Sequence, residues 1–159
     1  MSSSTTTTVL LLFILSLSTA TAATSYAPTA YEILKSYDFP AGLLPTGVTG
    51  YELDRDTGKF KVFLPETCKF SIEGYDLEYK STITGVISSG RLYKLKGISV
   101  KVLLLWLNIV EVDNKHGELQ FSVGIMSANF PVEGFEESPS CGCGFDCNGA
   151  NLAALVSSS

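Results

Sequence analysis

The chain has 159 residues, a length typical of one domain, and carries 11 basic against 16 acidic side chains, a formal net charge of −5. This acidic balance argues against a nucleic-acid partner, because proteins that bind a phosphate backbone present basic surfaces. The function classes that remain are small-molecule binding, catalysis and interaction with another protein.

The first residues have the pattern of a secretory signal peptide. A largely apolar run from Val9 to Leu17 is followed by small residues, with an A-x-A cleavage pattern at Ala20 and Ala22. The run is too short to span a bilayer, which takes about 20 residues. We therefore expect residues 1–23 to be a signal peptide and the mature protein to be secreted.

A short linker and a helix precede the strands. Residues 24–30 are predicted to be the linker. Thr29 suits the N-cap position of a helix because Glu32 follows three residues later, as in a capping box. Apolar residues on one face predict a helix at about residues 30–37, and Pro40 ends it.

From Val48 onward the pattern changes to that of strands. VTGYEL and KFKVFL flank the turn sequence DRDTG, in which Gly58 is free to adopt a positive φ, so they predict a hairpin. Further strands are predicted in CKFSIEG, YDLEYKSTITGVI, RLYKLKGI, KVLLLWLNIVEV and ELQFSVGIM, with a turn at Asp113–Gly117. About eight strands without intervening helices predict an all-β fold, an antiparallel barrel or roll or a sandwich, over residues 31–140.

One predicted strand, KVLLLWLNIVEV, does not alternate between apolar and polar residues. If Lys101–Val112 is a single strand, Leu103, Leu105 and Leu107 lie on one face and Trp106 lies on the other. The second face can be covered by the helix, can line a cavity for an apolar ligand, or can be exposed as a partner surface. The pattern alone leaves these three alternatives open.

Five basic residues and no acidic residue lie between Glu78 and Glu111. They are consistent with solvated strand faces and with lysines that discourage aggregation. The alternative is a basic rim that attracts an anionic ligand or a lipid head group, with peripheral contact to an anionic membrane. On that alternative the candidate ligand-binding residues are Lys94, Lys96, Lys101, Leu103, Leu105 and Leu107.

Four cysteines follow the predicted signal peptide, and three of them lie in a tail at residues 141–159. Cys141, Cys143 and Cys147 lack the spacing of a zinc site, so in an oxidising compartment the four thiols predict two disulfides. A bridge between Cys141 and Cys143 would close a very tight ring. Cys68 is therefore expected to pair with a tail cysteine, and the other two tail cysteines with each other.

Several segments together resemble the plant family known as domain of unknown function 538. They are FPAGLLP, GYELDRDTGKFKVFL, KVLLLWLNIVEV, FSVGIMSANFPVEGF and ESPSCGCGFDC. The resemblance implies an antiparallel β-rich roll or barrel behind a short helix, and the cysteine tail is similar to the secreted branch, which implies the plant apoplast or cell wall. The family has been likened to the lipid-binding half of bactericidal permeability-increasing proteins and to hydrolases of chlorophyll esters. Its name records that no common activity is established.

The sequence offers little machinery for catalysis or metal binding. It contains neither a G-x-S-x-G elbow nor a Ser-x-x-Lys motif, so an ester hydrolase would depend on His116 as its base, close in sequence to Asp113. That segment is more simply explained as a hairpin turn. Residues 54–58 lack the glycine and glutamate of a calcium loop, and ordinary turn chemistry explains them. We expect no metal and no cofactor.

The sequence therefore predicts a secreted, disulfide-stabilised, non-catalytic binding protein. The expected ligand is a lipid-like or amphipathic molecule, including an anionic one. The alternatives are an ester hydrolase and an extracellular protein-interaction module.

Overall fold

The computed structural model describes residues 26–147, so the predicted signal peptide at residues 1–23 and the predicted tail beyond Cys147 lie outside it. The described chain contains one α-helix, α1 (Ala30–Ser36), and two 3-10 helices, η1 (Ala41–Leu43) and η2 (Val132–Phe135). The strands are β1 (Gly50–Leu53), β2 (Lys59–Phe63), β3 (Cys68–Ile72), β4 (Tyr75–Ser88), β5 (Arg91–Val102), β6 (Leu105–Asn108), β7 (Glu111–Lys115), β8 (Glu118–Ser122) and β9 (Ser127–Pro131).

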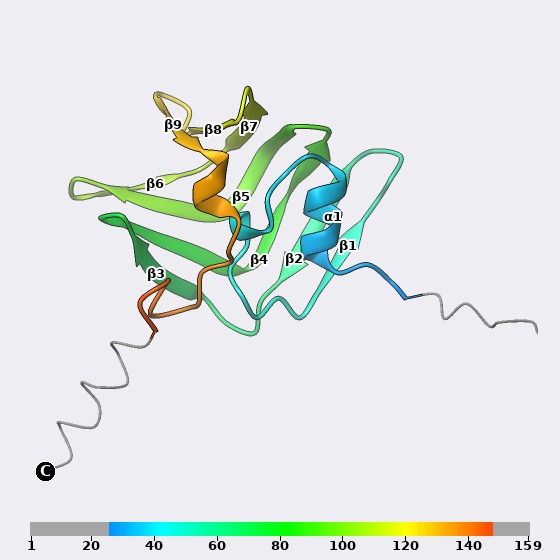
Figure 1. Cartoon of the computed structure of the whole chain (residues 1–159), viewed down its shortest axis with the longest axis horizontal. Coiled ribbons are helices and arrows are strands. Elements are labelled where there is room, and N and C mark those ends of the chain that lie inside the picture. The colour runs from blue at the N-terminus through cyan, green and yellow to red at the C-terminus, as the bar shows by residue number, and fades with distance from the viewer. Residues whose placement is uncertain (1–25, 148–159) are drawn as a thin grey trace, which may run out of the picture.

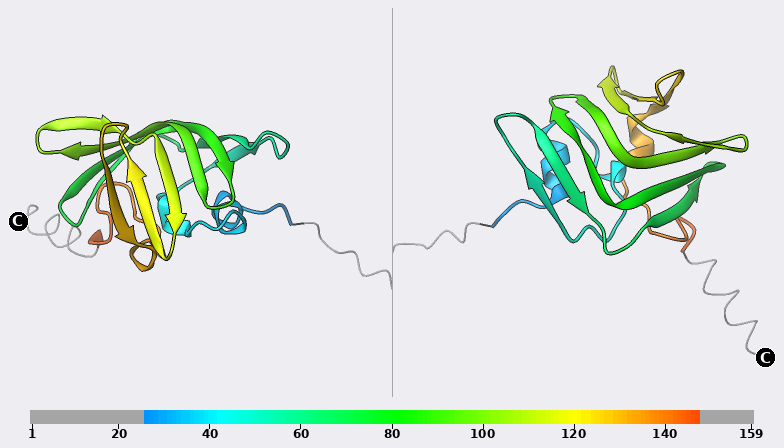
Figure 2. Two further views of the ribbon diagram at one scale, coloured as in Figure 1. Left: turned by 90° about the horizontal axis from the view of Figure 1, so that it is seen from above. Right: turned by 180° about the vertical axis from the view of Figure 1, so that it is seen from behind.

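All of these strands belong to one antiparallel sheet of nine strands (Figure 1). Its order is β1-β2-β4-β5-β7-β8-β9, with β3 also paired to β4 and β6 also paired to β5. The predicted all-β fold with one short N-terminal helix is confirmed. The sheet is not closed into a barrel, because among the described residues β1 pairs only with β2, and β9 only with β8. Figure 2 shows that the sheet is curled, with α1 and η1 on its concave side.

The two long strands, β4 and β5, produce the curl. β4 pairs first with β3 and then with β2, whereas β5 pairs first with β7 and then with β6. The register between β4 and β5 shifts between Tyr79 and Thr84, and again before Val86. Gly97 lies at this irregularity with a φ of 96°, and a Cβ there would lie 2.6 Å from the carbonyl oxygen of Thr82. The bend therefore requires glycine at this position.

The predicted helix is confirmed, together with its capping box. The Glu32 carboxylate accepts a hydrogen bond of 2.7 Å from the Thr29 backbone N–H, and the Thr29 hydroxyl accepts one of 3.2 Å from the Glu32 backbone N–H. The buried face of α1, formed by Ala30, Ile33 and Leu34, packs onto the concave side of the sheet. The cap fixes where the helix begins, and the apolar face fixes how it packs against the sheet.

The turns follow the expected chemistry. The Asp54 carboxylate accepts hydrogen bonds from the Thr57 hydroxyl and from the backbone N–H groups of Asp56 and Thr57, and these bonds lower its pKa. These hydrogen bonds give the carboxylate a structural role within the turn. The β7–β8 turn is shorter than the predicted Asp113–Gly117, because β7 continues to Lys115 and only two residues remain to make it.

The prediction that Lys101–Val112 is a single strand is wrong. β5 ends at Val102, Leu103 and Leu104 form a two-residue turn, and β6 returns antiparallel with Leu105 opposite Val102. The side chains of Leu103 and Leu104 are 91% and 88% exposed. Sequence reasoning missed this hairpin because the turn contains none of the Gly, Asn or Asp residues that usually mark one.

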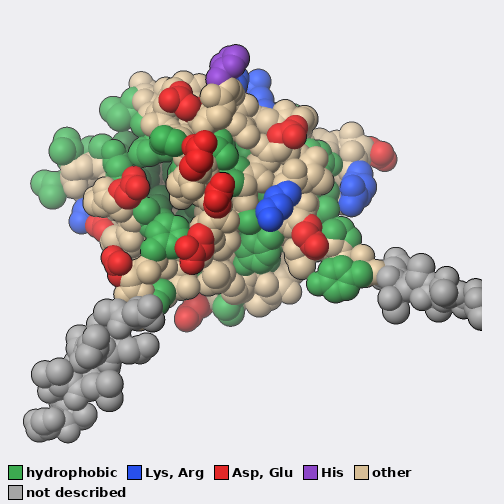
Figure 3. Space-filling view, viewed as in Figure 1, with side chains coloured by type: hydrophobic (Ala, Val, Ile, Leu, Met, Phe, Trp, Pro, Cys, Tyr) green, Lys and Arg blue, Asp and Glu red, His purple; other side chains and the backbone are tan. Residues whose placement is uncertain are grey.

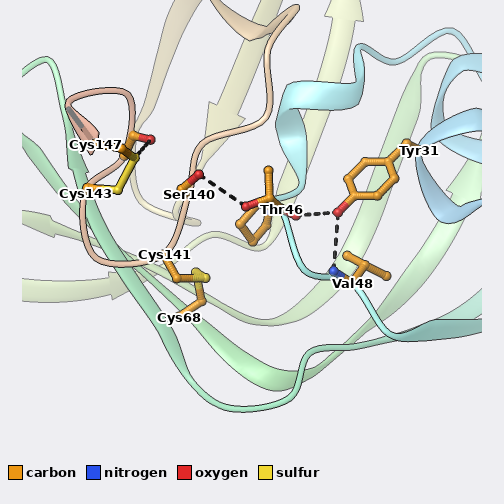
Figure 4. The surroundings of a disulfide bond; sticks show 10 residues. Tyr31, Thr46, Val48, Cys68, Ser140, Cys141, Cys143 and Cys147 are labelled. Atoms are coloured by element: carbon orange, nitrogen blue, oxygen red, sulfur yellow. Dashed lines mark hydrogen bonds between the residues drawn. A yellow bond between two sulfur atoms is a disulfide. The ribbon is translucent and has the colours of Figure 1, made fainter. Parts of the chain in front are cut away.

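One disulfide holds the end of the described chain against the sheet, and a second lies within that end (Figure 4). Cys68 in β3 pairs with Cys141, and Cys143 pairs with Cys147, as the expectation that Cys68 pairs with a tail cysteine requires. The segment before Cys141 also contacts the chain ahead of the sheet, since the Thr46 backbone N–H donates a 2.8 Å hydrogen bond to the Pro139 carbonyl oxygen. The tail is therefore tied to both β3 and the η1–β1 connection.

Candidate ligand-binding cavity

An apolar cavity of about 320 Å³ lies between the concave side of the sheet and the helices that cover it. Alternation along β4 turns Leu77 and Ile83 toward the cavity, and alternation along β5 does the same for Ile98, Val100 and Val102. Ile33 and Leu34 of α1 line the opposite wall. The volume falls at the lower end of the range of small-molecule sites, which are about 300–1,000 Å³.

Polar groups in the lining are few, and the hydroxyls of two lining tyrosines form hydrogen bonds within the fold. The Tyr79 hydroxyl donates a 3.0 Å hydrogen bond to the Leu43 carbonyl oxygen, and burial raises the pKa of this hydroxyl. The Tyr51 hydroxyl likewise donates to the Pro28 carbonyl oxygen at 2.8 Å. Glu73 is the one charged residue in the described lining. The cavity is therefore suited to an apolar molecule or the apolar part of an amphipathic one.

Aromatic rings close one side of the cavity. Phe121 of β8, Phe130 of β9 and Phe135 of η2 all line it, with centroid distances of 5.7 Å between Phe121 and Phe130 and 5.4 Å between Phe121 and Phe135. The Tyr75 ring packs edge-on against Phe130 at 5.7 Å. These rings bring β8, β9 and η2 over the end of β4, so the open sheet still encloses a space.

The mouth of the cavity lies where three hairpins end. Glu73 comes from the β3–β4 turn, Tyr75 from the start of β4, Val102 from the end of β5, and Val123 and Met126 from the β8–β9 loop. Hydrophobic side chains gather around a recess on this part of the molecule, at the left in Figure 3. The lining thus runs continuously from the core to the surface.

None of the six residues predicted to bind a ligand lines this cavity. Lys94 and Lys96 border a shallow depression on the other side of the sheet, and the Lys101 ammonium lies 3.8 Å from the Asp76 carboxylate. Leu103 and Leu105 are exposed on the β5–β6 hairpin, whereas Leu107 is half-buried. The basic residues of this segment therefore do not form a rim at the mouth of the cavity.

The structure does not assemble a catalytic arrangement around His116. This residue is exposed at the two-residue β7–β8 turn with a φ of 54°. The neighbouring Asp113 carboxylate accepts a 3.0 Å hydrogen bond from Lys115 and lies 3.7 Å from the Arg91 guanidinium. These basic side chains, and not an imidazole, surround the carboxylate. Neither His116 nor Asp113 lines the cavity.

Within residues 26–147 no cluster of His, Cys, Asp and Glu side chains has the arrangement of a metal site. All four cysteines are in disulfides. The helix of the described chain is also too short to cross a membrane.

Sequence reasoning missed the residues that form the mouth of the cavity. Met126 stands in the β8–β9 loop, where no alternation shows which way a side chain points, and Tyr75 is the first residue of β4. One signal was present, because Leu119 to Val132 contains no charged residue at all. Like the run from Val102 to Val110, this segment spans a hairpin whose tip carries exposed apolar side chains.

Comparison with known proteins gives a family and one curated relative. The family model described as "Protein of unknown function, DUF538" matches residues 30–136, which include all the described strands and all the cavity-lining residues. An uncharacterized protein of Arabidopsis thaliana, At5g01610, is 32% identical over 95 residues, which are 59% of this chain and 55% of the relative. The aligned part of the chain thus spans about half the length of the relative. The cysteines of the tail lie beyond the family match.

Proposed function

The chain belongs to the DUF538 family of proteins of unknown function. We propose that it is a secreted, non-catalytic protein that binds a lipid-like or amphipathic molecule in its apolar cavity. The observation that carries the proposal is a lining of aliphatic and aromatic side chains that continues to the surface. Such a lining offers an apolar guest burial without unsatisfied polar groups.

The chemistry of the cavity favours binding over catalysis. Ser127 lines the mouth, but no histidine or lysine stands among the described lining residues to activate its hydroxyl. Glu73 is the charged group nearest to a bound head group, and Lys94, Lys96 and Lys101 lie elsewhere. The proposal therefore keeps the lipid-like ligand and gives no preference to an anionic head group. Two disulfides support secretion, because such bonds persist in oxidising compartments.

Lipid analysis tests the proposal directly. The protein is isolated with both disulfides intact from its own tissue or a secreting host, and native mass spectrometry and solvent extraction then identify bound molecules. We expect one apolar or amphipathic molecule per chain. Protein that carries no such molecule and does not take up a fluorescent fatty acid would contradict the proposal.

A pair of variants locates the binding site. Val100→Phe places a ring in the cavity, whereas Val86→Phe adds the same ring at a half-buried position of β4 that does not line the cavity. We expect Val100→Phe to reduce the bound ligand and Val86→Phe to leave it unchanged. Equal loss in both variants would place the ligand outside the cavity. Thermal unfolding of both variants shows whether either has lost its fold.

A further inference from the structure

Two hairpin tips beside the cavity mouth hold apolar side chains in water. Leu103 and Leu104 form the β5–β6 turn, and Ile125, in the β8–β9 loop, is 84% exposed. Both tips lie at the same end of the molecule, at the left in Figure 1. We define these residues, together with the neighbouring exposed apolar residues of the same hairpins and of the start of β4, as the apolar tip surface. Its members are Tyr75, Leu103, Leu104, Leu105, Trp106, Ile125 and Met126.

The apolar tip surface is continuous with the cavity. Val102, which lines the cavity, immediately precedes the Leu103–Leu104 turn, and Met126, another lining residue, immediately follows Ile125. Tyr75 belongs to both the lining and the exposed surface. A body that covers the tips therefore also covers the entrance to the cavity.

The β5–β6 and β8–β9 tips lack charge, and Glu73 of the β3–β4 turn is the one charged residue of the described lining at the mouth. The segments Val102 to Val110 and Leu119 to Val132 contain no charged residue, so immersing them in hydrocarbon requires no charge to leave water. In the β5–β6 register Lys101 lies opposite Trp106, as the second residue pair from the turn. Tryptophan favours the boundary between lipid and water, and lysine extends its ammonium toward the aqueous side.

The backbone at the first tip gives an independent reason to regard its leucine as functional. Leu103 has a φ of 57°, in the left-handed region where Gly or Asn is the usual residue of a two-residue turn. A leucine there carries a local cost and gains almost no burial within the described chain, because its side chain is 91% exposed. Burial of this side chain against another body would offset that cost.

We propose that the apolar tip surface docks onto a lipid bilayer, with the leucines of the β5–β6 turn and Ile125 inserted and Trp106 at the head-group level. The cavity mouth then opens toward the acyl chains. A bilayer is favoured over a protein partner because separate uncharged tips around an entrance fit a fluid apolar medium. The bilayer also contains molecules of the chemistry that suits the cavity. This inference rests on the proposed function only for the reason why the protein would dock, namely to take up a lipid. Docking to a bilayer is measured independently of lipid uptake.

Trp106 is the one tryptophan of the chain and lies within the apolar tip surface, so its fluorescence reports on that surface alone. The protein with both disulfides is mixed with uncharged phosphatidylcholine vesicles, with and without bromine atoms on the acyl chains. We expect a blue shift of the Trp106 emission and quenching by the brominated lipids. Partitioning should change little between low and high salt, since no charge pair drives it.

Matched variants test the tips themselves. In Leu103→Asn/Leu104→Ser the turn keeps a residue that accepts positive φ, and we expect vesicle partitioning to weaken by at least about tenfold. Tyr26→Ser removes a side chain that is 76% exposed and does not belong to the apolar tip surface, so it should leave partitioning unchanged. Any contribution of the N-terminal residues cancels, because wild type and variants share them.

Several outcomes would overturn the proposal. They are failure of the wild type to partition, partitioning with Trp106 unquenched, and equal partitioning of Leu103→Asn/Leu104→Ser. Sedimentation that finds a dimer broken by the same variant, without vesicle binding, would assign the surface to a second copy of the chain. Vesicle binding by a protein that carries no lipid would refute the cavity function and keep the docking, whereas lipid uptake without vesicle binding would do the reverse.

Discussion

Cys68 in β3 is bonded to Cys141, which lies 73 residues further along the chain, whereas the second disulfide joins Cys143 to Cys147 across a separation of 4. Both bonds lie at the end of the described chain, yet they restrict very different lengths of the unfolded polypeptide. The first bond encloses β3 to β9, and the second encloses a single turn. Their contributions to stability should differ accordingly.

Removal of the long-range disulfide is expected to cost more than removal of the local one. From loop-closure entropy, Cys68→Ala/Cys141→Ala should lower the free energy of unfolding by about 4 kcal/mol, and Cys143→Ala/Cys147→Ala by about 2 kcal/mol. Urea denaturation of the two variants measures the difference. Equal costs would mean that native-state packing, and not the length of the closed loop, determines the effect.

Trp106 and Ile83 provide a second comparison, because burial and not size should decide the cost of truncation. The Trp106 side chain is 47% exposed on β6, whereas Ile83 is 1% exposed on β4. We expect Trp106→Ala to lower the free energy of unfolding by about 1 kcal/mol and Ile83→Ala by about 3 kcal/mol. Chemical denaturation measures both. A larger loss for the tryptophan variant would show that the β5–β6 hairpin packs more tightly than its exposure indicates.

Replacement of Leu103 separates stability from function. Leu103→Asn replaces leucine in the left-handed region with a residue whose short polar side chain tolerates that conformation, so stability should stay constant or rise by about 0.5–1 kcal/mol. Thermal unfolding measures this change, and vesicle partitioning of the same variant should weaken. A marked loss of stability would mean that the leucine contributes to the fold, against the exposure of its side chain.

Acidification should weaken the fold partly through Glu78. The ammonium groups of Lys80 and Lys69 lie 2.5 Å and 3.0 Å from its carboxylate and lower its pKa below the ordinary 4.5. A carboxyl with a lowered folded-state pKa stabilises the fold above its unfolded pKa and loses that contribution as the pH falls through the folded value. Stability should therefore fall as the pH decreases below 4.5.

Glu78→Gln identifies the share of Glu78 in this acid dependence. Urea denaturation between neutral pH and pH values below 4.5 should give a flatter profile for Glu78→Gln than for the wild type. Glu66→Gln is the control, since Glu66 is exposed between β2 and β3 and forms no ion pair with the described residues. Identical pH profiles for Glu78→Gln and the wild type would mean that the ion pairs of Glu78 do not contribute to the acid dependence of stability.

Much of the fold was predictable because its signals are local. Thr29 and Glu32 form a capping box within one helical turn, and Gly58 marks a hairpin that the flanking strands define by alternation. The close spacing of Cys141 and Cys143 excluded a disulfide between them, because its ring would be too tight, so Cys68 was expected to pair with a tail cysteine. In each case the residues whose pattern predicts the feature are the same residues that form the cap, the turn or the disulfide.

The features that escaped prediction depend on groups distant in sequence. Gly97 gave no sign that its neighbour across the sheet is the Thr82 carbonyl, so the bend and the two-partner pairing of β4 and β5 were not foreseen. Leu103 and Leu104 form a turn although leucine is not an ordinary turn residue. For this reason the end of β5, the whole of β6 and the start of β7 looked like one strand in the sequence. The cavity results from both features, and no single segment encodes it.

The order of strand pairing also bears on how the chain is made. Six of the eight strand pairings join consecutive strands, and the other two, β2 with β4 and β5 with β7, pass over a single strand. Short-range pairing of this kind lets the sheet assemble as the polypeptide emerges, without waiting for distant segments. Cys141 follows the last strand, so its bond to Cys68 closes on a sheet whose strands have all been synthesised. This disulfide can therefore form only after β1 to β9 have been synthesised, and it cannot restrict the earlier steps of strand pairing.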